Sequence, residues 1–436
     1  MCIVSDSLGA SEDVLFSDDR AGDTYTAAVY SPKQVEAAAR ATYAAFIGSG
    51  FAFASWASRI PQVRDRLDLT PADLGLVLLA IAAGSLIALP ISGLIIARLN
   101  TRLTTTVMAV VLAAALTIVA TGYFAGVGLV LIGLFLLGFA QGAWDVAVNV
   151  QGAQVERHLG RAIMPRFHAG FSLGTVAGAL LGVAMIALKI PVTAHLIAVA
   201  VIISVAVPTL VRRFLPDTTA LDARVESGPD ITESKPGVLA RWREPRTVLV
   251  GLFVLAFAFS EGTGNDWISV ALIDGHHAPA VVGTLGFAVF LAAMTTARWV
   301  GPGLLDRHGR VPVVRALALV AVIGVMLFVF SPNIPLAFLG ALLWGAGTSL
   351  GFPVGMSAAA DEPAAAAGRV SVVASIGYCA FLAGPPLIGF LGSHEGVLRA
   401  ITAVVVLLAI ATMLATTLRP PSAAAPSNPK ARHTTH

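Results

Sequence analysis

A carboxylate within an otherwise apolar segment is the first feature of this sequence that could carry chemistry. Asp145 lies in the apolar segment 128–155, with Gln141 four residues before it and Asn149 four residues after it. In a helix this spacing places the three polar side chains on one face. Asp145 is predicted either to bind substrate or carry a proton in a water-filled cavity, or to form a buried structural hydrogen-bond cluster with Asn149.

A second carboxylate occupies a comparable position in the later apolar segment 247–273. Glu261 is followed one helical turn later by Asn265, and then by Asp266 and Trp267. A water-filled cavity between two halves of a membrane protein would need polar groups from both sides. Glu261 is therefore predicted, together with the first carboxylate, to bind a solute or carry a proton in such a cavity.

The first apolar segment carries further candidates. At an offset of about 207 residues between the two halves of the chain, Arg59 corresponds to Asp266. These opposite charges are predicted to close an outer gate; the alternative is an arginine that extends to the membrane surface. Trp56 and Trp267 are interpreted either as flat apolar faces for a sugar ring or as anchors at the membrane interface.

Two basic side chains in or beside apolar segments need an explanation. Arg298 requires an acidic partner, for which Glu261 is one candidate, and it serves either structural pairing or the binding of an anionic substrate. His168 begins a segment beside Arg166. Because histidine titrates near neutral pH, His168 is a candidate for pH sensing or substrate binding; the alternative is a structural hydrogen bond.

The composition indicates that a membrane surrounds these residues. The chain has 436 residues, of which 56% are hydrophobic and 12% are charged, too few charges to cover a soluble domain of this length. Each apolar segment is long enough to cross about 30 Å of hydrocarbon as a helix. We predict an all-α membrane protein with twelve spans, near residues 40–66, 73–97, 103–123, 128–155, 165–188, 192–212, 247–273, 280–305, 312–331, 334–358, 369–392 and 396–418.

The distribution of charge predicts the orientation. Most Lys and Arg residues fall on the side that holds both ends of the chain, which the positive-inside rule identifies as the cytoplasm. We predict a multi-pass protein of the inner (plasma) membrane with both termini cytoplasmic. The first residues lack the basic region of a signal peptide. They are interpreted as a disordered extension; the alternative is that the start codon was assigned too early and these residues are not part of the protein. The predicted domains are an N-terminal extension, a six-helix bundle, a linker, a second six-helix bundle and a tail, at residues 1–38, 39–212, 213–246, 247–418 and 419–436.

The two predicted bundles repeat each other at the same offset of about 207 residues. Gly133 and Gly138 of the first bundle correspond to Gly340 and Gly345 of the second. Such internal symmetry is typical of a transporter built from two parallel repeats.

The connection between the second and third spans of each bundle resembles the signature G-x-x-x-D-R-x-G-R-R of the major facilitator superfamily. The second bundle keeps the core of this signature as Asp306, Arg307, Gly309 and Arg310, whereas in the first bundle Ala97 replaces the acidic residue. The resemblance covers nearly all of the two bundles and implies twelve helices in two pseudo-symmetric halves.

A narrower resemblance is to the YbjJ-like branch of inner-membrane permeases, which is distantly related to fucose permease. This resemblance implies a sugar-like or other polar metabolite as cargo and does not identify it. The segments that carry it are Phe53–Leu67, Trp144–Glu156, Pro165–Gly174, Ser260–Trp267 and Gly377–Gly389.

The superfamily resemblance also implies a cytoplasmic latch made of charged residues that control the conformational equilibrium without touching substrate. In the second bundle the signature loop is expected to face the end of the tenth span, and in the first bundle the signature arginines are expected to pair with an acidic residue. The predicted latch residues are Arg98, Arg102 and Glu156 in the first bundle and Asp306, Arg307, Arg310, Asp361 and Glu362 in the second.

The motifs of several enzyme classes are absent from the sequence. It contains no G-x-x-x-x-G-K-[ST], H-E-x-x-H or C-x-x-C pattern. We expect no enzyme activity, cofactor, bound metal or nucleic-acid partner. The leading prediction is a secondary active transporter, a monomer in the lipid bilayer that moves a small polar solute with protons by alternating access. A drug or metabolite exporter of the same superfamily and a transporter-like solute sensor are the alternatives.

Overall fold

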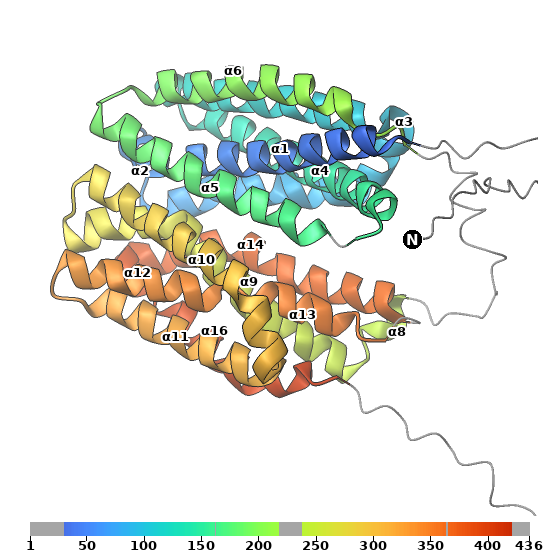
Figure 1. The fold of residues 1–436 in the computed structure, drawn as a ribbon. Coiled ribbons are helices and arrows are strands. Elements are labelled where there is room, and N and C mark those ends of the chain that lie inside the picture. Colours follow the sequence, from blue (N-terminus) through green and yellow to red (C-terminus); the bar gives the residue numbers. More distant parts are fainter. Residues whose placement is uncertain (1–29, 162, 218–237, 363–364, 421–436) are drawn as a thin grey trace, which may run out of the picture.

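The structure, a computed structural model, describes residues 30–161, 163–217, 238–362 and 365–420. Within these ranges the regular elements are all helices, and they form two groups that pack side by side (Figure 1). The predictions made for the start of the chain, for residues 218–237 and for the end of the tail lie outside the described residues.

The first group runs from residue 30 to residue 217. Ser31 and Thr70 cap the starts of two of its helices, and in each case a proline occupies the first helical position. These local signals explain where the helices begin. The elements are α1 (Pro32–Ala57), α2 (Ile60–Arg66), α3 (Pro71–Ala125), α4 (Val127–Leu159), α5 (Met164–Ala187), α6 (Val192–Leu210) and the short 3₁₀ helix η1 (Val211–Arg213).

The second group runs from residue 238 to residue 420. Its helix starts follow the same rules, since the Asn333 side chain accepts a hydrogen bond from the backbone of Leu336. The elements are α8 (Val238–Arg241), α9 (Pro245–His276), α10 (Ala280–His308), α11 (Arg310–Phe330), α12 (Ile334–Thr348), α13 (Gly351–Ala359), α14 (Ala366–Glu395), α15 (Val397–Ala400), α16 (Ala403–Leu414) and η3 (Ala415–Leu418).

The helices agree with the predicted number of spans. Ten helical segments of the described chain are long and apolar enough to cross a membrane. One of them, α3, is 55 residues long and turns at Asn100, whose φ of 64° interrupts the helix, so α3 comprises two predicted spans. Helix α1 is not among the ten and corresponds to the first predicted span. The described chain is therefore consistent with twelve spans.

Two spans that were predicted to be continuous are interrupted. The first breaks between α1 and α2, where Pro61 has no N–H to offer to the carbonyl of Ala57. The tenth breaks between α12 and α13, where Pro353 has the same effect on Ser349. Arg298 Nε donates to the freed Ser349 carbonyl at 3.1 Å, so a side chain replaces the lost backbone hydrogen bond.

Glycines at the predicted repeat positions make equivalent contacts in the two groups. Gly133 of α4 lies against the second part of α3, and Gly340 of α12 lies against α11. Gly138 lies against the first part of α3, and Gly345 lies against α10. A Cβ atom at any of these four positions would overlap the neighbouring helix. The two glycines of each pair therefore allow the same close helix contact in the first and the second group, as expected of an internal repeat.

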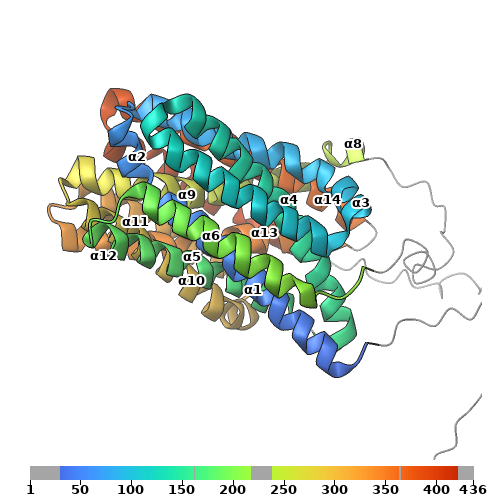
Figure 2. The same ribbon diagram turned by 90° about the horizontal axis from the view of Figure 1, so that it is seen from above.

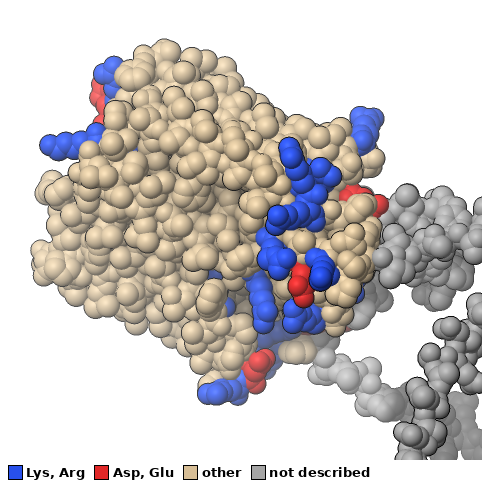
Figure 3. All heavy atoms as spheres, turned by 45° about the horizontal axis from the view of Figure 1, so that its top comes forward, with Lys and Arg blue, Asp and Glu red and all other residues tan. Residues whose placement is uncertain are grey.

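The two ends of the molecule differ in charge. We call the end where α1 and α9 begin, and where α4 and α10 finish, the basic end, because arginines gather there (Figure 3). We call the opposite end, formed by α2 and by the turns that join α5 to α6 and α9 to α10, the far end. Figure 2 shows α1, α3, α4 and α6 running alongside one another between these two ends.

The two helix groups meet closely at the far end. There α3 crosses α14 so tightly that a Cβ atom on Gly75 would overlap the Pro385 carbonyl, and one on Gly389 would overlap the carbonyl of Pro71. The backbone N–H of Ala72 also donates to the Ser393 hydroxyl at 2.9 Å. These backbone contacts close the space between the groups at the far end.

Candidate functional site

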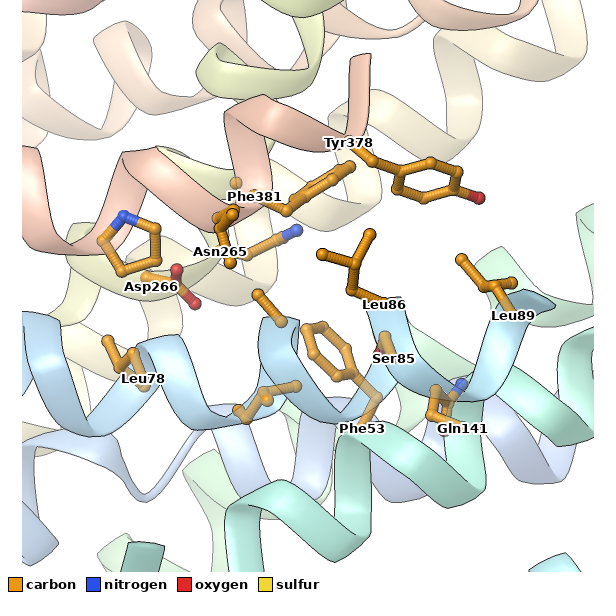
Figure 4. A pocket seen from close by; sticks show the side chains of 15 residues that line it. Phe53, Leu78, Ser85, Leu86, Leu89, Gln141, Asn265, Asp266, Tyr378 and Phe381 are labelled. Atoms are coloured by element: carbon orange, nitrogen blue, oxygen red, sulfur yellow. The ribbon is translucent and has the colours of Figure 1, made fainter. Parts of the chain in front are cut away.

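A cavity of about 200 Å³ lies between the two helix groups. Helices α3 and α14 form opposite walls, and α1, α4 and α9 also contribute side chains (Figure 4). Its polar lining residues are Ser85, Gln141, Asn265, Asp266 and Tyr378. A mostly apolar cavity with a few convergent polar groups is the usual form of a small-molecule site.

The cavity is rich in hydrogen-bond acceptors. Gln141 Nε2 donates to Ser49 Oγ at 2.5 Å, which leaves the Gln141 amide oxygen buried without a partner among the described residues. The Asn265 amide oxygen is unpartnered in the same sense. Asp266, the next residue, adds a partly buried carboxylate to which no described residue donates. Acceptors of this kind call for a bound molecule or water that donates hydrogen bonds.

Aromatic rings form part of the cavity wall. Phe53 from α1 and Phe381 from α14 both line it, as does the ring of Tyr378 (Figure 4). The two tryptophans that were predicted to contact a sugar do not line the cavity. Trp56 and Trp267 are 1% and 0% exposed and belong to the buried hydrophobic core, so both interpretations of them, as sugar platforms and as interface anchors, are wrong.

Asp145 lies beside the cavity lining and not in it. Its carboxylate accepts a hydrogen bond from Asn149 Nδ2 at 3.2 Å, and that same nitrogen donates to the Asp145 backbone carbonyl at 2.8 Å. No cation pairs with Asp145 in the described chain. The predicted face of α4 is therefore divided, with Gln141 in the cavity wall and Asp145 bonded to Asn149.

Glu261 forms an ion pair with Arg298, as the sequence analysis suggested. The guanidinium Nη2 of Arg298 lies 2.8 Å from Glu261 Oε2, and both side chains are partly buried. Arg298 thus connects Glu261 to the Ser349 carbonyl at the break between α12 and α13. This geometry favours the structural interpretation of Glu261, because its charge is already compensated.

The predicted outer gate between Arg59 and Asp266 is wrong. Arg59 is 2% exposed, and it donates through Nε to His195 Nδ1 at 2.9 Å and through Nη2 to the Ile190 carbonyl at 3.1 Å. It therefore reaches neither Asp266 nor the membrane surface. The repeat correspondence fails here because the first span breaks at Arg59, whereas α9 continues through Asp266.

A different ion pair joins the two groups at the far end. Arg64 of α2 donates to both carboxylate oxygens of Asp274 of α9, with Nη2 at 2.9 Å from Oδ1. The same guanidinium also contacts Asp65 at 2.6 Å. The sequence separation of 210 residues is close to the repeat offset, so extending the comparison of the first and seventh spans would have found this pair.

At the basic end, the charges of the second group pair with one another. Asp361 accepts from Arg310 at 2.6 Å and from Arg246 at 2.9 Å. The expected contact between the signature loop and the end of the tenth span is therefore present through Arg310. Asp306 and Arg307 are exposed and form no ion pair within the described residues.

Glu244, which the sequence analysis did not single out, anchors a second charged cluster at this end. It contacts Arg369 at 2.7 Å, Thr247 at 2.8 Å and Arg241, and Arg369 in turn contacts Glu362 at 2.9 Å. Partial burial opposes ionisation of Glu244, but the hydrogen bonds from Arg241, Arg369 and Thr247 outweigh it and lower its pKa to about 2.

The predicted pairing of the first group's latch residues is wrong in this conformation. Glu156 Oε2 accepts from the backbone N–H groups of Ile163 at 2.6 Å and Met164 at 2.7 Å, at the start of α5. Free N–H groups at a helix start require such an acceptor. Arg98 and Arg102 are exposed, and neither pairs with Glu156.

His168 is exposed on the first turns of α5, and its ring meets the edge of Phe46 at a centroid distance of 5.2 Å. Its side chain forms no hydrogen bond with a described residue, so the predicted structural hydrogen bond is not observed. Its roles in pH sensing or substrate binding stay predictions.

Two G-x-S-x-G sequences, Gly170–Gly174 and Gly347–Gly351, resemble the motif of a catalytic serine. That motif requires a strand-to-helix turn. Here Ser172 lies within α5 and Ser349 lies at the end of α12, and each hydroxyl donates to a carbonyl of its own helical turn. The geometry is that of helix packing.

Comparison with known families and relatives agrees with this architecture. The model of the Major Facilitator Superfamily matches residues 41–379 and, in a second overlapping match, residues 263–436. A protein described as uncharacterized transporter y4wD of Sinorhizobium fredii is 34% identical over 362 residues, covering 81% of this chain and 90% of that protein. An uncharacterized MFS-type transporter of Yersinia pestis is 30% identical over 369 residues, covering 84% and 92%.

Solved structures with a similar fold are transporters at low sequence identity. The nucleoside transporter NupG aligns with a TM-score of 0.65 at 15% identity, covering 87% of this chain and 98% of that chain. A D-xylose–proton symporter aligns with a TM-score of 0.69 at 12% identity, covering 88% and 97%. The fucose:proton symporter of E. coli aligns with a TM-score of 0.54 at 14% identity, covering 86% and 98%.

Proposed function

The chain belongs to the major facilitator superfamily, and from this premise we propose that it is a proton-coupled secondary transporter of a small polar solute. The observation that carries the proposal is the cavity between the two helix groups, lined by acceptors from both groups that have no partner in the described part of the chain. The groups touch at the far end, so alternating access would expose this cavity first to one side of the membrane and then to the other.

The distribution of charge supports an orientation with the basic end in the cytoplasm. Arginines cluster at that end, as the positive-inside rule requires of cytoplasmic loops. We assign the protein to the inner membrane with both termini cytoplasmic. We also retain the proposed division into bundles at 39–212 and 247–418 joined by a linker at 213–246.

The cavity favours a cargo that donates hydrogen bonds and has a ring-like apolar face. Hydroxyl groups of a sugar-like molecule would satisfy the amide oxygens of Gln141 and Asn265, while Phe53 and Phe381 offer flat surfaces. Structural neighbours that carry nucleosides, xylose and fucose support this cargo class. We also propose membership of the YbjJ-like branch.

Asp266 is the strongest candidate for proton coupling. It lies in the cavity with no cationic partner among the described residues, so its charge state can respond to the proton and the solute together. Asp145 lies outside the cavity lining but also has no cationic partner among the described residues, so it is a second candidate. Glu261 is a weaker candidate than the sequence predicted, because Arg298 holds it in an ion pair.

The proposal is tested by solute uptake into proteoliposomes across a panel of sugars and other polar metabolites, with and without a pH gradient. Asp266→Asn is expected to reduce the accumulation of solute driven by the pH gradient at least about tenfold, while exchange of solute across the membrane persists. Asp68→Asn, which neutralises an exposed carboxylate outside the cavity, is the matched control and is expected to behave as the wild type. Gradient-driven uptake that survives in Asp266→Asn would falsify the assigned proton site.

An exporter of drugs or metabolites is the second candidate function. The predominance of apolar residues among those lining the cavity favours it, since such walls suit less polar cargo. Vesicles of both orientations distinguish the two, because an exporter concentrates solute only in inside-out vesicles when the driving gradient is imposed.

A further inference from the structure

A second cavity, of about 670 Å³, opens near the basic end between α1, α5 and α10. It connects the two helix groups, since α1 and α5 belong to the first and α10 to the second. Three arginines line it, Arg40, Arg166 and Arg298, and no acidic residue of the described chain does. The transport function proposed above makes no use of this cavity.

Two of the three guanidinium groups have little or no compensation. Arg166 is exposed and forms no ion pair within the described residues. The carboxylate nearest to Arg40 is Glu36, at 4.0 Å, and both side chains are largely exposed, so this pair is weak. Arg298 is held by Glu261. Guanidinium groups with free N–H donors bind phosphate well, because their planar donor arrangement matches two phosphate oxygens.

The walls of the cavity are apolar and adjoin a surface that hydrocarbon must cover. Phe167 and Pro302 contribute to the walls, and Trp299 at the rim is 63% exposed. On the same helix Val300 and Leu304 are 60% and 41% exposed. An exposed apolar face beside a cationic cavity fits a ligand that has an anionic head and apolar chains.

We propose that this cavity binds the phosphate headgroup of an anionic phospholipid, whose acyl chains lie along the exposed face of α10. Basic cavities between helices at the cytoplasmic side of a membrane are suited to such headgroups, and a tryptophan at the rim is favourable at headgroup depth. A lipid fits better than a free phosphate ion, because the ion would leave the apolar walls and the neighbouring helix face unused.

Native mass spectrometry of the full chain tests the proposal. The protein is purified in detergent, stripped of lipid and titrated with phosphatidylglycerol or phosphatidylcholine carrying the same acyl chains. The wild type is expected to retain phosphatidylglycerol preferentially. Each lost arginine is expected to weaken retention by about fivefold, so the double variant Arg40→Gln with Arg166→Gln should bind about twenty-five-fold less tightly.

The control variant combines Arg212→Gln with Arg213→Gln, which removes the same charge at the same end of the molecule but outside the cavity. It is expected to keep the preference. Equal retention of both lipids by the wild type, or an equal loss in both double variants, overturns the proposal. Displacement of phosphatidylglycerol by inorganic phosphate at equal concentration also overturns it, since the site would then bind a free anion. Thermal unfolding checks that each variant is folded. If the double variant fails to fold, the single variant Arg166→Gln takes its place in the comparison.

Discussion

On α9, Glu261 and Asp266 are five residues apart and meet different neighbours. Glu261 is held by Arg298, which also donates to the carbonyl freed at the break in the tenth span. Asp266 faces the cavity with no such partner among the described residues. One carboxylate is therefore suited to hold the second group together, and the other is free to exchange a proton.

The structural role of this pair predicts an asymmetry between single and double substitutions. Arg298→Gln leaves Glu261 partly buried and uncompensated, and is expected to lower the Tm in detergent by several degrees. Adding Glu261→Gln is expected to recover most of that loss, because the unpaired charge is removed. A double variant as unstable as the single one would contradict the pairing.

Glu244 predicts a pH dependence at the basic end. Its pKa in the folded protein is lowered to about 2, against about 4.3 for an unperturbed glutamate. A depressed pKa contributes stability that is fully present above the unfolded value and is lost as pH falls through the folded value. The Tm difference between wild type and Glu244→Gln should therefore be constant from neutral pH to about pH 5, and should shrink between about pH 4 and pH 2. A difference that changes near neutral pH would exclude this cause.

Among the candidate residues, the surroundings of the polar side chains could be predicted, whereas those of the tryptophans and of Arg59 could not; the part that any polar residue plays in transport stays a prediction. An amide or carboxylate inside a span must meet a cavity or a partner, so Gln141, Asn265 and Asp266 could be predicted. A tryptophan is equally stable in a packed interior, and no local pattern distinguishes these positions. The prediction for Arg59 assumed a first helix that continues past it, but that helix ends at Ala57.

At the scale of helices, α5 packs along α1 through a row of glycines. A Cβ atom on Gly174 would overlap the Ile47 carbonyl, and one on Gly178 would overlap the carbonyl of Phe51. Gly174→Ala is expected to destabilise the protein by about 1–3 kcal/mol, because the helices must separate. Gly303→Ala, at a helical glycine with open space around it, is the control and should leave the Tm within about a degree or raise it slightly. Equal Tm values for the two variants would show that the two helices can adjust.

Most spans could be predicted within a few residues, because their apolar segments are long enough to cross the membrane. The first is the exception, since its helix begins at Pro32 and not near residue 40. Capping residues such as Thr70 and Asn333 mark helix starts that the apolar pattern alone does not. The two interruptions were missed, since a proline within an apolar span either kinks the helix or breaks it, and the neighbouring helices decide which. Pro90 lies inside α3, where the helix continues, whereas Pro61 follows a break.

For the whole molecule, the ion pair between Arg64 and Asp274 predicts a gate at the far end. Asp274→Arg places two like charges across the junction and is expected to reduce solute uptake by about tenfold or more. Combining it with Arg64→Asp restores an attractive pair and should recover a substantial part of the activity. Arg66→Asp, at an exposed arginine on the same helix, is the control for added negative charge. No recovery in the double variant would exclude a gating role for the pair.

The crossing of α3 and α14 at Gly75 and Gly389 has a consequence for the energy economy of a host cell. The backbones themselves meet at this junction, so a Cβ atom on either glycine would force α3 and α14 apart. Such a residue is expected to disfavour closure of the far end. A variant whose far end fails to seal when the basic end opens would conduct ions down their gradients, and a cell that expressed it would lose membrane voltage whether or not any nutrient were present.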